Sequence, residues 1–450
     1  MRTLASSGTR DELGGLLAQH PAVDYVYSYP PRQAYGPVDP DELTAAIHRS
    51  LARPGGVGLY VHFPFCRQIC SFCNLYAVVG TAHDLFERYT DALLGEAASY
   101  AGVVRGKPID TVYLGGGTPS QIHPELMDRV LSGLERLYGF DRRDVSEVAL
   151  EVAPDTVTAQ ALDAWRDVGI NRVNLGLQTG DELEMRLIGR KHDAKLPVQA
   201  AALALAAGFD NVCIDLIYGL QGQTDSSWRD SVRTVIELGP PTVCAYPLTL
   251  RPRTGYAARG YSHVDVELQT SRYDYVHQAL LDAGYEQQTH VRWARGPRGG
   301  YRQKADHWAM GSIVGLGAGA RGYLWDCDYR NGYSVRRRMP VLTDWFARTD
   351  AAGHGRTDGF LMDDDERVRK AVILGLHDLD RQRFAALFGF DVVERFGPQL
   401  QALEELGLLA IDAARTTLTS EGMRRRDVVV QAFFSERVRS RLAAFDYDRD

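Results

Sequence analysis

Short apolar runs alternate with amphipathic stretches between residues 57 and 250. The runs have the length of buried strands and lie at 57–63, 111–114, 147–152, 172–175, 211–217 and 242–247. Apolar side chains recur at helical spacing between them, at 85–100, 124–137, 159–168, 196–207 and 227–238. Strands that alternate with helices predict an α/β fold, a parallel sheet covered by helices with right-handed crossovers. A closed eight-stranded barrel would need two more repeats, which the chain after residue 250 does not supply.

The segments on either side lack this alternation. Before it, two prolines after Tyr29 forbid a helix, so we expect an extended arm that packs on the main domain or covers its functional site. After it, residues 292–303 are rich in arginine and glycine, which fits a solvated loop or a contact for an acidic substrate. Near the end, two amphipathic helices and a hairpin at 408–419 predict a small helical domain of winged-helix type. The predicted domains are therefore an arm, a barrel, an extension and a small C-terminal domain: residues 1–56, 57–250, 251–362 and 363–450.

The composition excludes several classes of protein. The chain has 450 residues, of which 45% are hydrophobic and 24% charged, an ordinary globular balance. Its net charge of −7 argues against a general nucleic-acid surface. No apolar run reaches the length of a membrane span, and residues 1–22 lack the apolar core of a signal peptide. We expect a cytoplasmic monomer that binds neither nucleic acid nor a membrane.

Three cysteines follow the first predicted strand at C-x3-C-x2-C spacing: Cys66, Cys70 and Cys73. Three thiolates in one tight loop can hold three irons of a [4Fe–4S] cluster, whereas such clusters normally have four protein ligands. The fourth iron would then be open to another molecule. Structural zinc needs a fourth ligand, and His62 lies one strand step back from the loop. Disulfides would leave one thiol unpaired, in a chain without signs of an oxidising compartment.

The surrounding residues, Y-V-H-F-P-F-C at 60–66, make the pattern narrower. The segment resembles the radical S-adenosylmethionine (SAM) superfamily, and within it the subfamily typified by oxygen-independent coproporphyrinogen III dehydrogenase. This resemblance implies a partial (βα)6 barrel of TIM type whose chemistry lies on loops at the C-terminal strand ends. It also implies that the open iron binds SAM and that the cluster cleaves SAM reductively to a 5′-deoxyadenosyl radical. A flavodoxin or ferredoxin would supply the electron, and a small molecule would be the substrate.

Further motifs stand at the predicted strand ends, where the resemblance assigns contacts with SAM. A glycine run alone indicates only a turn, and a lone carboxylate is usually solvated. Asp215 lies inside an apolar strand and needs a partner, either a ribose diol or an arginine such as Arg190. By resemblance, Tyr60 packs near the sulfonium as the catalytic candidate, and Phe72 offers its backbone to the adenine. The other SAM contacts that the resemblance implies are Gly116, Gly117, Thr118, Glu151, Gln178, Arg190, Asp215 and Thr249.

The resemblance leaves several reactions open. Coproporphyrinogen decarboxylases often have a further cysteine where this chain has Leu75, and haem chaperones have a His-Asn-x-x-Tyr-Trp segment of which residues 304–308 keep only the aromatic end. The chain nevertheless retains Gln178, Arg190 and Asp215. Our hypothesis is therefore an enzyme that uses a second SAM for C-methylation or cyclopropanation of a specialised metabolite. The alternatives are oxidative decarboxylation of coproporphyrinogen III and a haem chaperone without turnover.

Overall fold

The computed structural model describes residues 25–446 except 81, 253, 262, 263, 335, 353 and 357, together with 11, 13–15 and 17. The chain forms two compact units. The barrel unit comprises Gly36–His307 and Gly311–Leu361. The small unit comprises Trp308–Met310, Met362–Phe445 and the described part of Met1–Tyr35. The predicted arm of residues 1–56 is therefore divided between the two units at residue 35.

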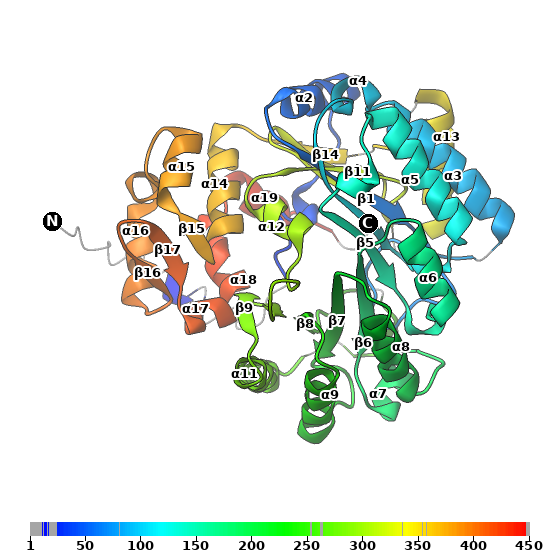
Figure 1. Ribbon diagram of the computed structural model, residues 1–450. Helices are drawn as coiled ribbons and strands as arrows, with labels where there is room; N and C mark the ends of the chain where they lie inside the picture. Colours follow the sequence, from blue (N-terminus) through cyan, green and yellow to red (C-terminus); the bar gives the residue numbers. More distant parts are fainter. Residues whose placement is uncertain are drawn as a thin grey trace. The chain divides into compact units, whose positions relative to one another are not determined.

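A 12-stranded sheet forms the centre of the barrel unit in the described part of the chain, and Figure 1 shows helices along its outer face. Its strand order is β14-β13-β12-β11-β1-β4-β5-β6-β7-β8-β10-β9. The strands are β1 (Val57–Phe63), β4 (Ile109–Gly116), β5 (Glu147–Val152), β6 (Arg172–Gln178), β7 (Asn211–Tyr218), β8 (Thr242–Pro247), β9 (Glu286–Thr289), β10 (Arg292–Ala294), β11 (Ser312–Leu316), β12 (Arg321–Tyr323), β13 (Cys327–Arg330) and β14 (Asp358–Leu361).

The six predicted strands are confirmed as β1 and β4 to β8, each parallel to the next. A seventh parallel strand, β11, lies beside β1 and was not predicted. Antiparallel strands continue the sheet beyond β11 and beyond β8. The described sheet therefore stays open at β14 and β9, as a partial barrel does.

The helices of the barrel unit include all five that the spacing of apolar residues predicts. They are α2 (Pro40–Ala52), α3 (His83–Ala98), α4 (Ala101–Val104), α5 (Pro124–Tyr138), α6 (Ala159–Asp167), α7 (Glu182–Leu187), α8 (Lys195–Ala206), α9 (Asp225–Leu238), α10 (Gly255–Ala258), α11 (Val266–Asp282), α12 (Arg302–Trp308) and α13 (Arg338–Ala352). Short 3₁₀ turns lie at Pro119–Gln121, Arg142–Asp144 and Pro154–Thr156.

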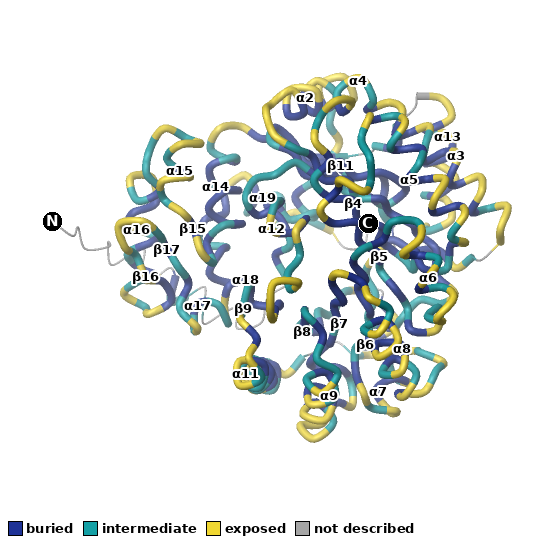
Figure 2. Tube along the Cα trace, viewed as in Figure 1, coloured by how far each residue is buried: buried dark blue, intermediate teal, exposed yellow. Residues whose placement is uncertain are grey.

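Local sequence signals set the helix ends. Helix α9 begins at a capping box formed by Thr224 and Ser227, and it ends at Gly239 in the left-handed conformation. Helix α5 has Pro124 in its first turn and ends in the same way at Gly139. In Figure 2 the strands are largely buried and the exposed residues gather on helices and loops. The core thus lies between the sheet and its covering helices.

The segment that follows β10 closes the N-terminal end of the barrel. Gln303 donates from Nε2 to the Leu59 carbonyl at 2.9 Å, and its backbone N–H donates to Glu147 at 3.1 Å. The Tyr301 ring stacks on Tyr113 with centroids 5.5 Å apart. The prediction of a solvated loop at 292–303 is therefore wrong at both ends, because Arg292 is buried in β10.

The small unit contains the predicted C-terminal domain. Its helices and strands follow the order of a winged-helix domain, and in the described residues β17 lies between β15 and β16. The kink at Phe396 explains why the sequence predicts a helix start at Pro398, within α16. The elements are η1 (Arg32–Ala34), α14 (Asp364–Gly375), β15 (Asp378–Asp380), α15 (Arg381–Phe388), α16 (Val392–Glu405), β16 (Leu409–Ile411), β17 (Arg415–Leu418), α17 (Ser420–Arg424), α18 (Arg426–Val429), η5 (Val430–Phe433) and α19 (Glu436–Ala443).

The described part of the arm bonds to this small unit. The Tyr29 hydroxyl donates to Glu366 Oε2 at 2.6 Å, and the Val26 N–H donates to Asp427 Oδ1 at 3.1 Å. Residues 25–35 of the predicted arm therefore belong to the small unit. The reason is that Glu366 and Asp427 offer buried carboxylates to an extended segment whose backbone needs partners.

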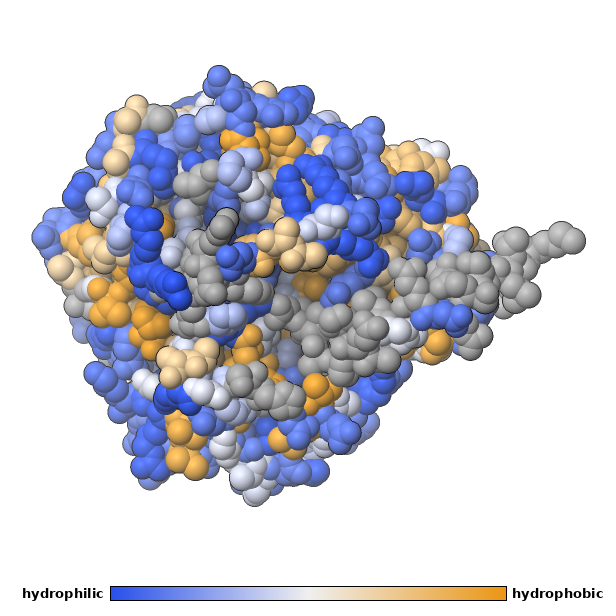
Figure 3. Space-filling model, turned by 180° about the vertical axis from the view of Figure 1, so that it is seen from behind, coloured by the Kyte–Doolittle hydropathy of each residue, from blue (hydrophilic) through white to orange (hydrophobic). Residues whose placement is uncertain are grey.

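Hydrophilic residues cover most of the face drawn in Figure 3, and hydrophobic residues form smaller areas between them. Among the described residues, no helix is both long enough and apolar enough to span a membrane.

Candidate active site

Solvent reaches the inner side of the central strands at a few positions. In β1, β5 and β7, which the structure describes throughout, one residue each is only partly buried: Tyr60, Glu151 and Asp215. In β6 the two such residues are Gly176 and Gln178. Four of these five positions are predicted SAM contacts. The inner face of the barrel is therefore open where the sequence places the ligand.

Backbone hydrogen bonds hold the loop that carries the three cysteines, both where its two ends pair and in its middle. At its start, the short strand β2 (Phe65–Cys66) pairs with β3 (Val78–Val79), and Cys66 lies opposite Val79. In its middle, the Ser71 N–H donates to the Ile188 carbonyl at 2.8 Å, and the Ser71 carbonyl accepts from Tyr256. The backbone therefore fixes the loop.

The cysteines suit a cluster better than a single ion. All three thiols are free, and their sulfur atoms do not all lie within 4.8 Å of one another in the described chain. Ligands of one ion would lie closer, whereas the corners of a cube keep sulfurs apart. Burial raises the pKa of the Cys66 thiol to about 11 and that of the Cys73 thiol to about 12. Bonds to iron would stabilise the thiolates in this setting.

His62 is not available as a metal ligand. Its Nε2 donates to the Tyr76 carbonyl at 2.9 Å, so Nδ1 of the neutral ring accepts from the Tyr60 hydroxyl at 3.0 Å. Burial lowers the pKa of His62 to about 4, which keeps the ring neutral. The zinc interpretation with His62 as fourth ligand is therefore wrong.

The glycine run after β4 brings two strand ends into close contact. A Cβ at Gly117 would lie 2.6 Å from the Phe65 carbonyl oxygen, and Gly116 has a φ of +116° against the His62 ring. The Gly116 N–H donates to Glu151 Oε2 at 2.8 Å, and the Thr118 hydroxyl lies 3.5 Å from Cys66 Sγ. The run thus places Thr118 beside the cysteine loop.

Glu151 accepts a second hydrogen bond, from the Tyr113 hydroxyl to Oε1 at 2.9 Å. Burial raises the pKa of the Glu151 carboxyl to about 7, although these two donors oppose the shift. The carboxyl can therefore change its charge near neutral pH.

Gln178 and Arg190 meet at the end of β6. Gln178 has a φ of +72°, the left-handed region that non-glycine residues rarely adopt, and the β6–β7 register shifts beside it. Arg190 Nη1 donates to the Gly176 carbonyl at 2.8 Å. Gly176 in turn lies opposite Asp215 in the neighbouring strand. The structure thus brings the predicted Gln178, Arg190 and Asp215 to one level of the barrel.

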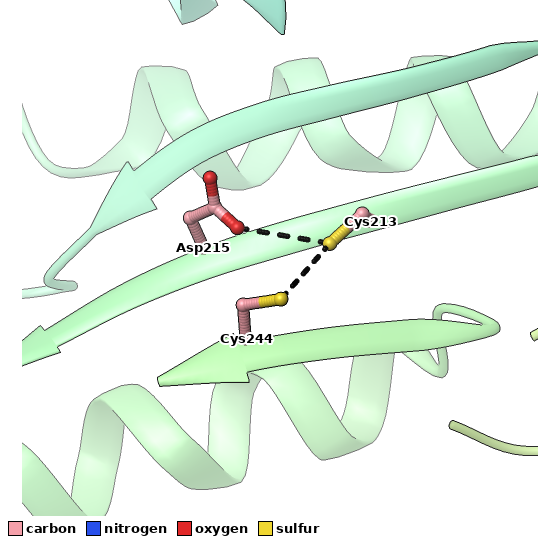
Figure 4. Close-up of side chains that lie close together, drawn as sticks. All are labelled: Cys213, Asp215 and Cys244. Atoms are coloured by element: carbon pink, nitrogen blue, oxygen red, sulfur yellow. Dashed lines mark hydrogen bonds between the residues drawn. The ribbon is translucent and has the colours of Figure 1, made fainter. Parts of the chain in front are cut away.

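Asp215 has a thiol as its neighbour. Its Oδ1 lies 3.6 Å from Cys213 Sγ, which is 3.6 Å from Cys244 Sγ, and Figure 4 shows the other carboxylate oxygen pointing away from both thiols. No ion pair joins Asp215 to Arg190 in the described chain. The interpretation of Arg190 as the partner of the Asp215 carboxylate is therefore wrong. Burial raises the pKa of the Asp215 carboxyl well above its usual range.

The side chains of Cys213, Asp215 and Cys244 are close enough together to bind a thiophilic metal ion. The positive charges of Arg172 and Arg292 also act on Cys244, which opposes a cation. We therefore interpret the two thiols as the support of the Asp215 carboxylate, with its other oxygen left for a ligand.

The polar floor of the barrel was not predicted from the sequence. Arg172 is 1% exposed, lies 4.1 Å over the Tyr301 ring and pairs with Glu147 at 3.4 Å. The Asn174 side chain donates to the Tyr113 hydroxyl at 2.9 Å. The sequence does contain a signal for these residues. Side chains alternate between the two faces of a strand, so Arg172 and Asn174 lie on the same inner face of β6 as Gly176.

The remaining predicted residues lie around the same site. Tyr60 stacks on Tyr113 with centroids 5.8 Å apart, on the inner face of β1. Phe72 packs on an apolar cluster that includes Ile217 and Leu248. Thr249 follows β8 by two residues. Their contacts with SAM stay predictions.

A partial parallel barrel with a three-cysteine loop after its first strand and polar residues at the following strand ends defines a radical SAM protein. In agreement, residues 60–235 match the family model of the radical SAM superfamily, and residues 362–425 match that of the HemN C-terminal domain. The chain belongs to the radical SAM superfamily, in the subfamily of HemN and HemW.

Relatives with curated names agree over most of their length. The chain is 27% identical over 388 residues to the heme chaperone HemW of Bacillus subtilis, covering 84% of this chain and 99% of the relative. It is 30% identical over 287 residues to HemW of Escherichia coli, covering 63% of this chain and 74% of the relative. It is 26% identical over 397 residues to oxygen-independent coproporphyrinogen III oxidase of Escherichia coli, covering 84% of each.

The fold is also that of a solved structure. Coproporphyrinogen III oxidase (HemN) from Escherichia coli superimposes with a TM-score of 0.79 at 24% identity, covering 91% of this chain and 96% of that chain. The predicted partial barrel with a small C-terminal domain is therefore confirmed. These relatives are named as chaperones and an oxidase, so they give the hypothesis of C-methylation no support.

Proposed function

We propose that this protein cleaves SAM reductively and directs the resulting radical to a tetrapyrrole. The observation that carries the first part is the coincidence of two sets of residues. The inner-face positions that solvent reaches are mostly those at which the sequence predicts SAM contacts. Cys66, Cys70 and Cys73 would hold the cluster beside them.

When bound, the cluster supplies the electron that splits the sulfonium C–S bond of SAM, leaving methionine and a 5′-deoxyadenosyl radical. The chain's own residues bind and orient SAM for this step. Asp215 would bind the ribose hydroxyls through its outer oxygen, while Cys213 fixes the inner one. The Glu151 carboxylate would accept from a donor group of SAM, and Tyr60 would cover the sulfonium.

The tetrapyrrole substrate class is supported by the relatives, which are named as haem chaperones and a coproporphyrinogen oxidase and match along most of their length. The HemW relatives favour a second candidate, in which the protein binds haem and does not turn over. Leu75 stands where coproporphyrinogen decarboxylases often carry a cysteine, which weighs against decarboxylation. The test therefore uses both coproporphyrinogen III and haem as ligands.

The test is an anaerobic assay of the full-length protein reconstituted with iron and sulfide, using dithionite as reductant. 5′-Deoxyadenosine is measured with coproporphyrinogen III and with haem, and the Soret band is followed during haem titration. Tetrapyrrole-dependent 5′-deoxyadenosine that is lost in Cys70→Ala supports the proposal. A Soret band without 5′-deoxyadenosine supports the second candidate, a protein that binds haem without turnover. Formation of S-adenosylhomocysteine would support the hypothesis of methyl transfer from a second SAM.

A further inference from the structure

Arg292 is a buried arginine without an anionic hydrogen-bond partner. It is 6% exposed in β10, and its Nε has no hydrogen-bond partner. None of the carboxylates in the described chain forms an ion pair with its guanidinium group. A buried charge that lacks such a partner destabilises a protein. The fold therefore keeps a cationic group at a position where a bound anion would stabilise it.

The strand register places Arg292 on the inner face of the barrel, level with Asp215. Arg292 lies opposite Cys244 in the β8–β10 pair, and Cys244 lies opposite Asp215 in the β7–β8 pair. Opposite residues of neighbouring strands project to the same face of a sheet. The guanidinium carbon of Arg292 lies 5.6 Å from the centroid of the Tyr301 ring, at the barrel floor. Arg292 therefore faces the interior in which the polar residues of the site gather.

A second arginine, Arg172, borders the same aromatic ring. Its guanidinium carbon lies 4.1 Å from the Tyr301 centroid, and none of its three side-chain nitrogens has a hydrogen-bond partner in the described chain. It pairs with Glu147 at 3.4 Å. The two oxygens of that carboxylate already accept from the backbone N–H groups of Arg302 and Gln303. Both guanidinium groups thus keep unused donors beside the Tyr301 ring.

The other ionisable groups of this interior do not use these donors. Glu151 already accepts two hydrogen bonds, and burial raises the pKa of Asp215 well above its usual range, which favours the neutral carboxyl. The hydrogen bond from Cys213 and the charge of Arg292 lower the pKa of Cys244, so the Cys244 sulfur supplies part of the counter-charge. Sulfur is a weak acceptor, and in the described chain that of Cys244 accepts no hydrogen bond from Arg292.

A guanidinium group presents its donors in a planar fork that matches a carboxylate. We propose that Arg292, with Arg172 across the Tyr301 ring, binds a carboxylate side chain of the substrate inside the barrel. The proposal rests on the proposed function, because it places the substrate in the same interior. It adds that the substrate is acidic, and it names the residue that selects for the acid.

The experiment compares coproporphyrin III with its tetramethyl ester, which has the same ring and no free carboxylate. Binding to the reconstituted full-length protein is followed by quenching of tryptophan fluorescence. Arg292→Gln should weaken binding of the acid about thirtyfold, the contribution of a hydrogen bond between charged groups, and leave binding of the ester unchanged. The matched control is Arg298→Gln, at an exposed arginine of the segment that follows β10. Equal weakening by this control would overturn the proposal.

A purely structural role of Arg292 predicts a different result for stability. Arg292→Gln should raise the unfolding temperature of the ligand-free protein, because it removes a buried charge that lacks a hydrogen-bonded partner. A variant that is less stable than wild type and binds the acid as tightly would overturn the proposal. The same holds if Arg292→Gln loses affinity for SAM and keeps its affinity for the acid, because the carboxylate would then be that of SAM.

Sodium propionate separates this proposal from the proposed function, because it carries the carboxylate without the ring. At equal ionic strength it should raise the unfolding temperature of wild type more than sodium chloride does, and this difference should vanish in Arg292→Gln. Protection by propionate without porphyrin binding would support the subsite and contradict the tetrapyrrole as substrate. Porphyrin binding that is equal for acid and ester would overturn the subsite and leave the tetrapyrrole in place.

Discussion

The His62 ring donates a hydrogen bond to the Tyr76 carbonyl at 2.9 Å, although 14 positions separate the two residues. The cysteine loop lies between them in sequence, so this one bond links the chain before Cys66 to the chain after Cys73. The ring is 3% exposed and its neutral form makes both of its hydrogen bonds. Its charge state therefore bears on the stability of the loop.

Acid should weaken the barrel unit through His62. The folded pKa of about 4 lies below the ordinary value of 6.5, so the stability that this group contributes is present above pH 6.5 and is lost as the pH falls towards 4. The loss amounts to about 2 kcal/mol at pH 5. Urea unfolding at pH 7.5 and pH 5 should show this extra loss in wild type relative to His62→Gln. Equal losses in both proteins would contradict the assignment.

Cys70→Ala should remove most of the bound iron, together with the formation of 5′-deoxyadenosine from SAM. The cause is the loss of one of three thiolates that share the cluster. Iron analysis and visible absorption of the reconstituted protein measure the effect. The matched control is Cys327→Ala, because Cys327 is buried in β13 and belongs to no metal-binding spacing. Iron loss of equal size in the control would count against the cysteine loop as the site.

Replacing Gln178 should separate backbone strain from ligand binding. Gln178→Gly should stabilise the protein by about 1 kcal/mol, because glycine accepts a φ of +72° without steric cost. Gln178→Ala should give no such gain. Both variants lack the amide, so both should bind SAM about tenfold more weakly. Thermal unfolding and equilibrium binding of SAM test the two parts, and equal stability of the two variants would refute the strain.

The affinity for SAM should depend on pH through Glu151. Its pKa of about 7 means that the carboxylate forms as the pH rises through 7, so binding of a cationic ligand should strengthen in that direction. Between pH 6 and pH 8 the ionised fraction rises about tenfold, and the affinity should rise by a similar factor. Equilibrium binding of SAM across this range measures it. Glu151→Gln should bind weakly and without this pH dependence.

Glu96 shows what the sequence could not indicate. It is fully buried on α3 and accepts from the Gly317 N–H, the Gly355 N–H and the Asn331 side chain at 2.7, 3.0 and 2.7 Å. Glu96→Ala should destabilise the barrel unit by about 3 kcal/mol, because it leaves these buried donors unpaired. Chemical unfolding tests this, with the exposed Glu87→Ala as control. A loss of the same size in both would disprove the buried role.

The strands that the sequence predicts correctly are those buried on both faces, because such strands are continuous apolar runs. Glu147–Val152 and Thr242–Pro247 agree with the prediction at both ends. Strand β11 was missed because the glycines at 315 and 317 make its short run resemble a turn. Gly315 is needed because a Cβ there would lie 2.3 Å from the Arg321 carbonyl oxygen. Such a contact between distant segments leaves no local pattern.

The site residues divide in the same way. Asp215 could be singled out from the residues alone, because it is a polar residue inside an apolar strand, whereas Glu151 and Gln178 were assigned only through the family resemblance. The support of Asp215 by Cys213 depends on the register between two strands, which a single sequence does not show. Tyr301 reaches the barrel floor from a segment that the sequence places in a loop.

The hydrogen bonds of the arm have a consequence for the order of synthesis. Residues 25–35 leave the ribosome before the barrel unit, yet Asp427 and Ser435, to which they bond, are made after it. The barrel unit can therefore fold while the arm still waits for its partners. A chain released early, before residue 427, would carry an unpaired extended segment that is open to proteases and to other chains.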